Sequence, residues 1–188
     1  MKVNKWIGLL LLVGGGIFLV QNLGQKEGGQ VMADEKIKIL NYETGEYEMK
    51  EKIEKTEAEW KKILDKEQYH ILREEGTERP FTSPLLENKG PGVYVSAASG
   101  VALFRSDQKF KSGTGWPSFF DVIDPANVEL REDNSLFMKR VEVVDKLSGS
   151  HLGHVFEDGP QPTGLRYCIN GDALKFVPDK DMKTDGGH

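Results

Sequence analysis

The hydrophobic positions are spaced differently at the start of the chain and in the rest of it. Lys2 and Lys5 come first, the stretch Trp6–Val20 is apolar, and no charged residue appears from Trp6 to Gln25. A helix needs about 20 apolar residues to cross the hydrocarbon core of a bilayer. The pattern therefore predicts a hydrophobic helix within residues 1–25, with its two lysines on the cytoplasmic side and the rest of the chain exported.

Two interpretations of this segment remain open, a signal anchor that is retained and a signal peptide that is removed. The tripeptide Val31-Met32-Ala33 resembles a weak cleavage site, but it lies far beyond the apolar run, which favours the anchor. A third alternative, a helix packed on the chain's own domain, is disfavoured by Gly14-Gly15-Gly16 and by the basic start. Residues 26–40 are polar and rich in glycine near their start, which predicts a tether.

Two helices are predicted by their boundary residues. Thr56 followed by Glu59 has the spacing of a capping box, which predicts a helix over Glu57–Leu64. A second short helix is predicted over Lys66–Glu75, ended by Gly76. The segment 36–50 has too little pattern to predict an element.

From Gly92 onward, short apolar segments alternate with turn residues, which predicts an antiparallel β domain. Residues 41–179 are expected to form this domain, with a loose tail over 180–188. The expected strands are Val93–Val95, Val101–Phe104, Leu136–Val144, His154–Phe156, Leu165–Asn170 and Leu174–Val177.

The composition and charge of the chain exclude some classes of function. The 188 residues carry a net charge of −5 with no clustered basic segment, so a nucleic-acid-binding surface is not expected. Cys168 is the single cysteine of the sequence, which excludes an internal disulfide and a site of several thiolates. One unpaired thiol also suits export, since further cysteines in an oxidising compartment would pair with it.

The residues around Cys168 indicate a reactive thiol. Alternation along a strand places Arg166, Cys168 and Asn170 on one polar face, with the apolar side chains between them on the other. A positive charge and hydrogen-bond donors lower the pKa of a thiol. The alternative is an inert exposed cysteine.

Two further clusters carry candidate chemistry. Trp116 lies in the segment Ser112–Phe119, where two glycines and a proline fix a turn, so its ring is either an apolar wall for a ligand or a plug at the edge of the core. His151 and His154 lie three residues apart beside a glycine. They suit acid–base work on a nearby thiol, packing, or half of a metal site, which lacks further ligands here.

Taken together, three segments closely resemble the B-type methionine sulfoxide reductases, the peptide-methionine (R)-S-oxide reductases. They are Ser112–Phe119, His151–Pro160 and Thr163–Pro178, and residues 76–81 and 109–111 also fit. The resemblance covers roughly residues 41–179. It implies two antiparallel β-sheets with N-terminal helices packed alongside, and a role in the repair of proteins after oxidative stress.

The resemblance also implies a role for each matching residue. Cys168 would be the nucleophile that becomes a sulfenic acid, a product that thiols reverse. Asn170 would position water or substrate, and one of the two histidines would protonate the departing oxygen. Trp116 and Phe156 would hold the methyl end of the substrate, and Arg166 would support the thiolate's surroundings. The catalytic set is thus Cys168, His151, His154 and Asn170, and the substrate-binding set is Trp116, Phe156 and Arg166.

Two departures from the family's pattern matter. Many members carry two Cys-x-x-Cys pairs that bind a structural zinc, where this chain has Ser96 and Ser99, then Asp145 and Ser148. Serine hydroxyls are poor zinc ligands, so no structural zinc is expected. Many members also have a resolving cysteine where this chain has Thr114. The sulfenic acid would then be reduced directly by an external thiol, such as a thioredoxin-like protein.

Two other classes of function are retained as alternatives. A one-cysteine thiol peroxidase would share the sulfenic acid without needing Trp116. A non-enzymatic module that binds oxidised methionine would have no need of Cys168.

Overall fold

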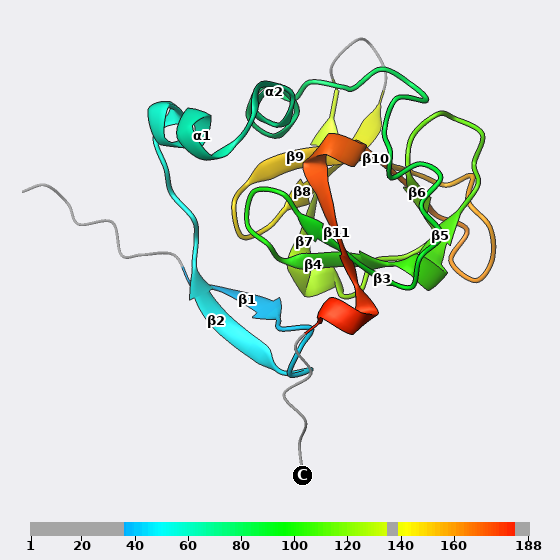
Figure 1. The fold of residues 1–188 in the computed structure, drawn as a ribbon, viewed down its shortest axis with the longest axis horizontal. Coiled ribbons are helices and arrows are strands. Elements are labelled where there is room, and N and C mark those ends of the chain that lie inside the picture. Colours follow the sequence, from blue (N-terminus) through cyan, green and yellow to red (C-terminus); the bar gives the residue numbers. More distant parts are fainter. Residues whose placement is uncertain (1–35, 135–138, 183–188) are drawn as a thin grey trace, which may run out of the picture. The chain divides into compact units, whose positions relative to one another are not determined.

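The computed structural model describes residues 36–134 and 139–182, and within them the chain is mainly β (Figure 1). The predicted N-terminal hydrophobic helix lies outside the described residues. None of the helices in the described part is long and apolar enough to span a membrane. The strands are β1 Lys36–Leu40, β2 Tyr47–Glu51, β3 Gly92–Ser96, β4 Ala102–Arg105, β5 Lys109–Phe110, β6 Ser118–Phe119, β7 Val128–Asp133, β8 Arg140–Asp145, β9 Ser150–Phe156, β10 Arg166–Ile169 and β11 Leu174–Pro178.

These strands form three antiparallel sheets in the described residues, where the resemblance implies two. The largest has the order β5-β6-β10-β9-β8-β7, a second has the order β11-β3-β4, and β1 pairs with β2. The mainly β class is confirmed. The additional sheet is a hairpin formed by Lys36–Leu40, at the end of the expected tether, and by Tyr47–Glu51.

Aromatic side chains join the two larger sheets. Tyr94 on β3 and Phe104 on β4 are fully buried against Phe119 on β6, with ring centroids 5.0 Å and 4.3 Å from that of Phe119. Phe104 also lies 5.8 Å from Tyr167 on β10. Because successive residues of a strand face opposite sides, the neighbours of Phe119 and Tyr167, Ser118 and Cys168, lie on the other face of the six-stranded sheet.

The two α-helices of the described residues begin with capping boxes. Helix α1, Glu57–Ile63, is capped by Thr56 and Glu59, as predicted. Helix α2, Lys66–Glu74, has a second capping box made by Asp65 and Gln68, and it ends at Glu75 in the left-handed conformation rather than at Gly76. Figure 1 shows α2 beside β9, against which it packs.

The predicted strands near the site are longer or shifted in the structure. The strand predicted over His154–Phe156 begins at Ser150. The strand predicted over Leu136–Val144 begins at Arg140, while residues 135–138 lie outside the described part. Its partner β7 was not predicted, because its residues Val-Glu-Leu-Arg-Glu-Asp are mostly charged and Leu130 is half exposed.

Candidate active site

The strand register brings four candidate side chains into one row across the six-stranded sheet. Ser118 on β6 is opposite Cys168 on β10, Cys168 is opposite His154 on β9, and His154 is opposite Glu142 on β8. Residues directly opposite in antiparallel strands share a face and lie close together. The row therefore places an acceptor carboxylate, an imidazole, a thiol and a hydroxyl side by side.

His151 joins this face through an irregularity in β9. In a regular strand, residues three apart point to opposite faces. The β8–β9 register shifts between Val143 and Val144, so that Val143 pairs with Gly153 and Val144 with His151. Such a bulge re-aims a side chain. The rings of His151 and His154 consequently lie 5.4 Å apart.

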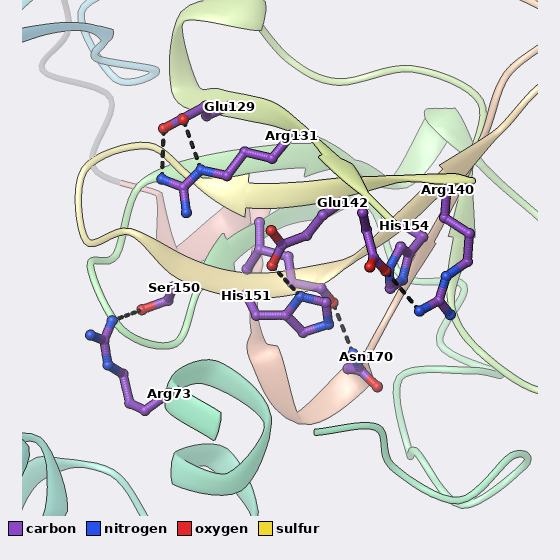
Figure 2. Close-up of polar contacts among 11 residues, drawn as sticks. Arg73, Glu129, Arg131, Arg140, Glu142, Ser150, His151, His154 and Asn170 are labelled. Atoms are coloured by element: carbon purple, nitrogen blue, oxygen red, sulfur yellow. Dashed lines mark hydrogen bonds and ion pairs between the residues drawn. The ribbon is translucent and has the colours of Figure 1, made fainter. Parts of the chain in front are cut away.

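Each histidine is bonded to a carboxylate. His151 Nδ1 lies 2.7 Å from Glu142 Oε1 (Figure 2), and His154 Nε2 lies 2.9 Å from Asp133 Oδ2. Arg140 lies 2.7 Å from the same Asp133 oxygen. Because an ionised carboxylate only accepts, the bonded ring nitrogen carries the proton in each pair. The nitrogens that remain, Nε2 of His151 and Nδ1 of His154, are the proton-accepting atoms of the neutral rings.

Burial controls the charge of His154. Its removal from water lowers the pKa of His154, while its hydrogen bond to Asp133 acts in the opposite direction. His151 is more deeply buried, with 4 % of its surface exposed. The site therefore holds His154 in its neutral form at neutral pH, ready to accept a proton.

The thiol is partly buried and mainly neutral when no substrate is bound. Burial raises the pKa of Cys168, and the Thr114 hydroxyl, the positive charge of Arg166 and the Ser118 hydroxyl lower it to a lesser extent. The positive surroundings expected from the sequence are present, but they do not outweigh burial. A neighbouring base is therefore needed to take the thiol proton.

Arg166 is fixed by two contacts beside the thiol. Its guanidinium donates to Asp158 at 2.8 Å and 2.9 Å, and this bond raises the pKa of Arg166. The same guanidinium lies 4.4 Å from the ring centroid of Phe156, which faces Arg166 across the β9–β10 pair. Arg166 thus supplies a fixed positive charge next to Cys168 and holds the Phe156 ring in place.

Asn170 lies beyond the end of β10 and bonds to backbone. It is nearly fully buried, its Oδ1 accepts from Glu78 N at 3.1 Å, and its Nδ2 donates to Leu152 O at 3.1 Å. Figure 2 shows Asn170 close to His151. Asn170 therefore connects the start of β9 to the segment around Glu78. In this structure its amide orders the backbone beneath the site.

Glu78 was not singled out from the sequence, although it connects several parts of the site. Its carbonyl oxygen accepts from Trp116 Nε1 at 3.2 Å, and its carboxylate accepts from the backbone of Gly171 and Asp172 at 2.7 Å and 3.1 Å. Burial raises the pKa of Glu78 and the two backbone N–H groups oppose this. Glu78 thereby fixes the Trp116 ring relative to Asn170. Asp133 and Glu142 were also missed, since their pairing with the histidines depends on strand register.

A groove of about 490 Å³ borders the Trp116 loop. Phe81 lines it, is 67 % exposed, and is held there because its backbone N–H donates to Gly115 O at 2.7 Å. Gly115 has φ +96°, and an added Cβ would lie 2.6 Å from Pro80 Cβ, so this position requires glycine. Ser112 and Ser118 also line the groove, and Ser118 is the residue opposite Cys168 in the β6–β10 pair.

Of the four positions compared above with the family's zinc-binding pattern, Ser96, Asp145 and Ser148 form a hydrogen-bonded cluster. Asp145 Oδ2 accepts from Ser96 Oγ and Ser148 Oγ, both at 2.6 Å, and Oδ1 accepts from Leu147 N at 3.0 Å. Asp145, Ser96 and Ser148 are buried. The donors and acceptors of the cluster are bonded to one another, so these residues do not fit a zinc ion.

The comparisons with known proteins identify the class of protein as an oxidoreductase. The SelR domain model matches residues 64–178, and the chain belongs to this family, the MsrB methionine sulfoxide reductases.

Named relatives support the same assignment. The chain is 62 % identical over 130 residues to peptide methionine sulfoxide reductase MsrB of Methanosarcina mazei, an alignment that covers 69 % of this chain and 93 % of that protein. It is 51 % identical over 128 residues to the MsrB of Leptospira interrogans, covering 68 % and 98 %. It is also 51 % identical over 127 residues to the MsrB of Agrobacterium fabrum, covering 68 % and 94 %.

Proposed function

We propose that the protein reduces methionine-(R)-sulfoxide in oxidised proteins back to methionine, with Cys168 as nucleophile. Membership of the MsrB family supports the reaction class. The observation that carries the proposal is the register that places Cys168 directly opposite His154, with Ser118 on its other side. A thiol beside a carboxylate-bonded imidazole is the arrangement of an activated nucleophile.

In the first step the thiol proton moves to a histidine and the thiolate attacks the sulfur of the sulfoxide. The histidine returns this proton to the sulfoxide oxygen as the sulfur–oxygen bond of the substrate breaks. The oxygen is thereby released as hydroxide, which attacks the Cys168 sulfur and breaks the sulfur–sulfur bond formed by the first attack. Methionine leaves with its sulfur reduced by two electrons, and Cys168, oxidised by two electrons, carries the oxygen as a sulfenic acid. His151 and His154 both present an accepting nitrogen, so both are candidates for this proton transfer.

The substrate's methyl group would be held by aromatic walls. The Trp116 ring is fixed through its N–H to Glu78, and the Phe156 ring is fixed beneath Arg166. Two flat apolar surfaces in set positions distinguish the methyl arm of a sulfoxide from its oxygen and its lone pair. This supports selection of one epimer.

An external thiol would complete the cycle. The sequence contains one cysteine, so the sulfenic acid has no partner within it. Two external thiols, such as those of a thioredoxin-like donor, would be oxidised to a disulfide as the Cys168 sulfenic acid returns to the thiol and water forms. No structural zinc is proposed, because the Ser96–Asp145–Ser148 hydrogen bonds already join the two turns concerned.

We also propose that the reductase works outside the cytoplasm, tethered to the membrane by residues 1–25. The basic start and the apolar run of the sequence support this. Secretion after signal cleavage is the alternative, and the size of the protein in isolated membranes and in the culture medium separates the two.

The proposed chemistry is tested by trapping its intermediate. Purified protein is given one equivalent of a methionine-(R)-sulfoxide peptide without reductant, and dimedone is added to label sulfenic acid. The expected result is one methionine released and one label on Cys168, detected by mass spectrometry. Binding of the peptide without release of methionine would favour the binding module. Dimedone labelling that is far faster after oxidation by hydrogen peroxide than after reaction with the sulfoxide would favour the peroxidase.

A further inference from the structure

A chain of three hydroxyl groups leads away from the Cys168 sulfur. Thr114 Oγ1 lies 3.8 Å from Cys168 Sγ, Ser112 Oγ lies 2.8 Å from Thr114 Oγ1, and Ser118 Oγ lies 2.7 Å from Ser112 Oγ. Ser118 Oγ also donates to the carbonyl oxygen of Trp116 at 3.1 Å. The chain thus connects the sulfur to the backbone of the residue proposed to hold the substrate methyl.

The number of protons available to these hydrogen bonds determines which group of each pair is the donor. Each hydroxyl can donate one hydrogen bond. When the thiol is neutral, its S–H donates to Thr114, Thr114 to Ser112, Ser112 to Ser118, and Ser118 to the Trp116 carbonyl. All four contacts then contain one proton, and the chain is fully satisfied.

Ionisation of Cys168 must reverse the chain. A thiolate only accepts, so Thr114 has to donate to the sulfur, Ser112 to Thr114 and Ser118 to Ser112. Three protons then serve four contacts, and the bond from Ser118 to the Trp116 carbonyl is lost. The gain is a hydrogen bond to a charged acceptor, which is stronger than one between neutral groups.

We propose that Thr114, which stands where many relatives have a resolving cysteine, stabilises the Cys168 thiolate as the first member of this reversing chain. The proposal builds on the role of Cys168 given above, but it concerns ionisation of the thiol and not sulfoxide turnover. Thr114 contacts the reacting sulfur and Ser112 acts through it as a positioning residue, while Ser118 faces the sulfur directly from β6 and also lowers the pKa of the thiol.

Other charged groups around the sulfur must be held constant in a test. Arg166 lies two residues away on β10 and pairs with Asp158, and His154 faces Cys168 from β9 and pairs with Asp133. On β6 the facing residue is the neutral Ser118. Substitution of Thr114 changes none of these charges, so a shift in the titration reports the hydroxyl itself.

The test measures alkylation of Cys168 by iodoacetamide across pH in the purified full-length chain. In Thr114→Val, which keeps the side chain's shape and removes the hydroxyl, the thiol should titrate about one pH unit higher, so alkylation at neutral pH slows roughly tenfold. Thr114→Ser keeps a hydroxyl and should titrate like the wild type. At pH values at which the Cys168 thiol is fully ionised in every protein, the wild type and both variants should be alkylated at the same rate. This control separates an effect on ionisation from an effect on access to the sulfur.

Ser112→Ala tests the rest of the chain. Thr114 would still donate to the sulfur but would lose its own incoming hydrogen bond, so the shift should have the same direction and be smaller. The proposal would be overturned if the thiol of Thr114→Val titrated at the same pH as that of the wild type, or if Ser112→Ala did not shift the titration of the thiol. Circular dichroism of each variant establishes that it is folded. Since alkylation needs no sulfoxide reduction, failure of the proposed function would not change the outcome.

Discussion

His154 on β9 lies directly opposite Cys168 on β10, and the same imidazole donates to Asp133 at 2.9 Å. The pairing places a base next to a thiol whose burial keeps it mainly protonated. His151 reaches the same face only through the irregular register of β9 and bonds to Glu142. The site thus contains two carboxylate-bonded histidines, and the predictions below separate their roles.

Replacing the histidine that transfers the proton should lower kcat by roughly 100-fold, the scale of general acid–base catalysis. His151→Gln and His154→Gln are compared by steady-state kinetics with a sulfoxide peptide. His70→Gln is the control, because His70 is an exposed residue on α2. Full kcat in both site variants would contradict a histidine as proton carrier.

Glu142→Gln tests the orientation of His151 separately. The amide keeps the size of the side chain but removes the charge that stabilises a protonated ring, so we expect a lower kcat with an unchanged KM. An unchanged kcat would show that His151 does not transfer the proton.

Trp116→Ala should lower kcat/KM by roughly tenfold to a hundredfold, because losing the apolar contact of a large side chain costs about 1.5–3 kcal/mol. Trp116→Phe keeps an apolar wall but loses the N–H bond to Glu78. Its kcat/KM should therefore lie between those of the wild type and of Trp116→Ala. Alkylation of Cys168 should be unaffected in both. Loss of sulfoxide reduction with intact thiol reactivity would also exclude the peroxidase alternative.

The stability of the protein should depend on pH through His154. Burial lowers the pKa of this group below its usual 6.5, so in acid the unfolded chain binds a proton before the folded chain does. The free energy of unfolding should therefore fall as the pH falls through 6.5. In urea unfolding, the free energy of unfolding of His154→Gln should decrease less between about pH 7.5 and 5.5 than that of the wild type. Equal losses in both proteins would contradict this assignment.

Asp145→Ala should destabilise the fold by about 3 kcal/mol, because it leaves two buried hydroxyls and one N–H without their acceptor. Asp107→Ala, at an exposed aspartate, is the control. Thermal unfolding is measured with and without added zinc, and neither zinc nor a chelator should change the melting temperature of the wild type. A zinc-dependent rise would contradict the proposal that hydrogen bonds replace the metal.

Alternation and capping patterns predicted much of the fold. The burial of β10 follows the predicted alternation, with Tyr167 and Ile169 buried and Arg166 and Cys168 partly exposed. The Thr56 capping box marked the start of α1. The hairpin of β1 and β2 was missed because its residues are largely exposed, and only Ile39 among them is fully buried.

The site was less predictable because it depends on register. Sequence spacing alone places His151 and His154 on opposite faces of a strand, and the shift at Val143/Val144 that brings them together has no local signal apart from Gly153. An added Cβ at Gly153 would lie 2.2 Å from Cys168 O. That glycine is explained by the closeness of β9 and β10, which only the tertiary pairing reveals.

The central claim is most directly tested with separated R and S epimers of a methionine sulfoxide peptide, incubated with the protein and dithiothreitol. The account predicts that the R epimer alone is reduced and that Cys168→Ser abolishes the reaction. Reduction of the S epimer, or turnover that survives Cys168→Ser, would contradict it.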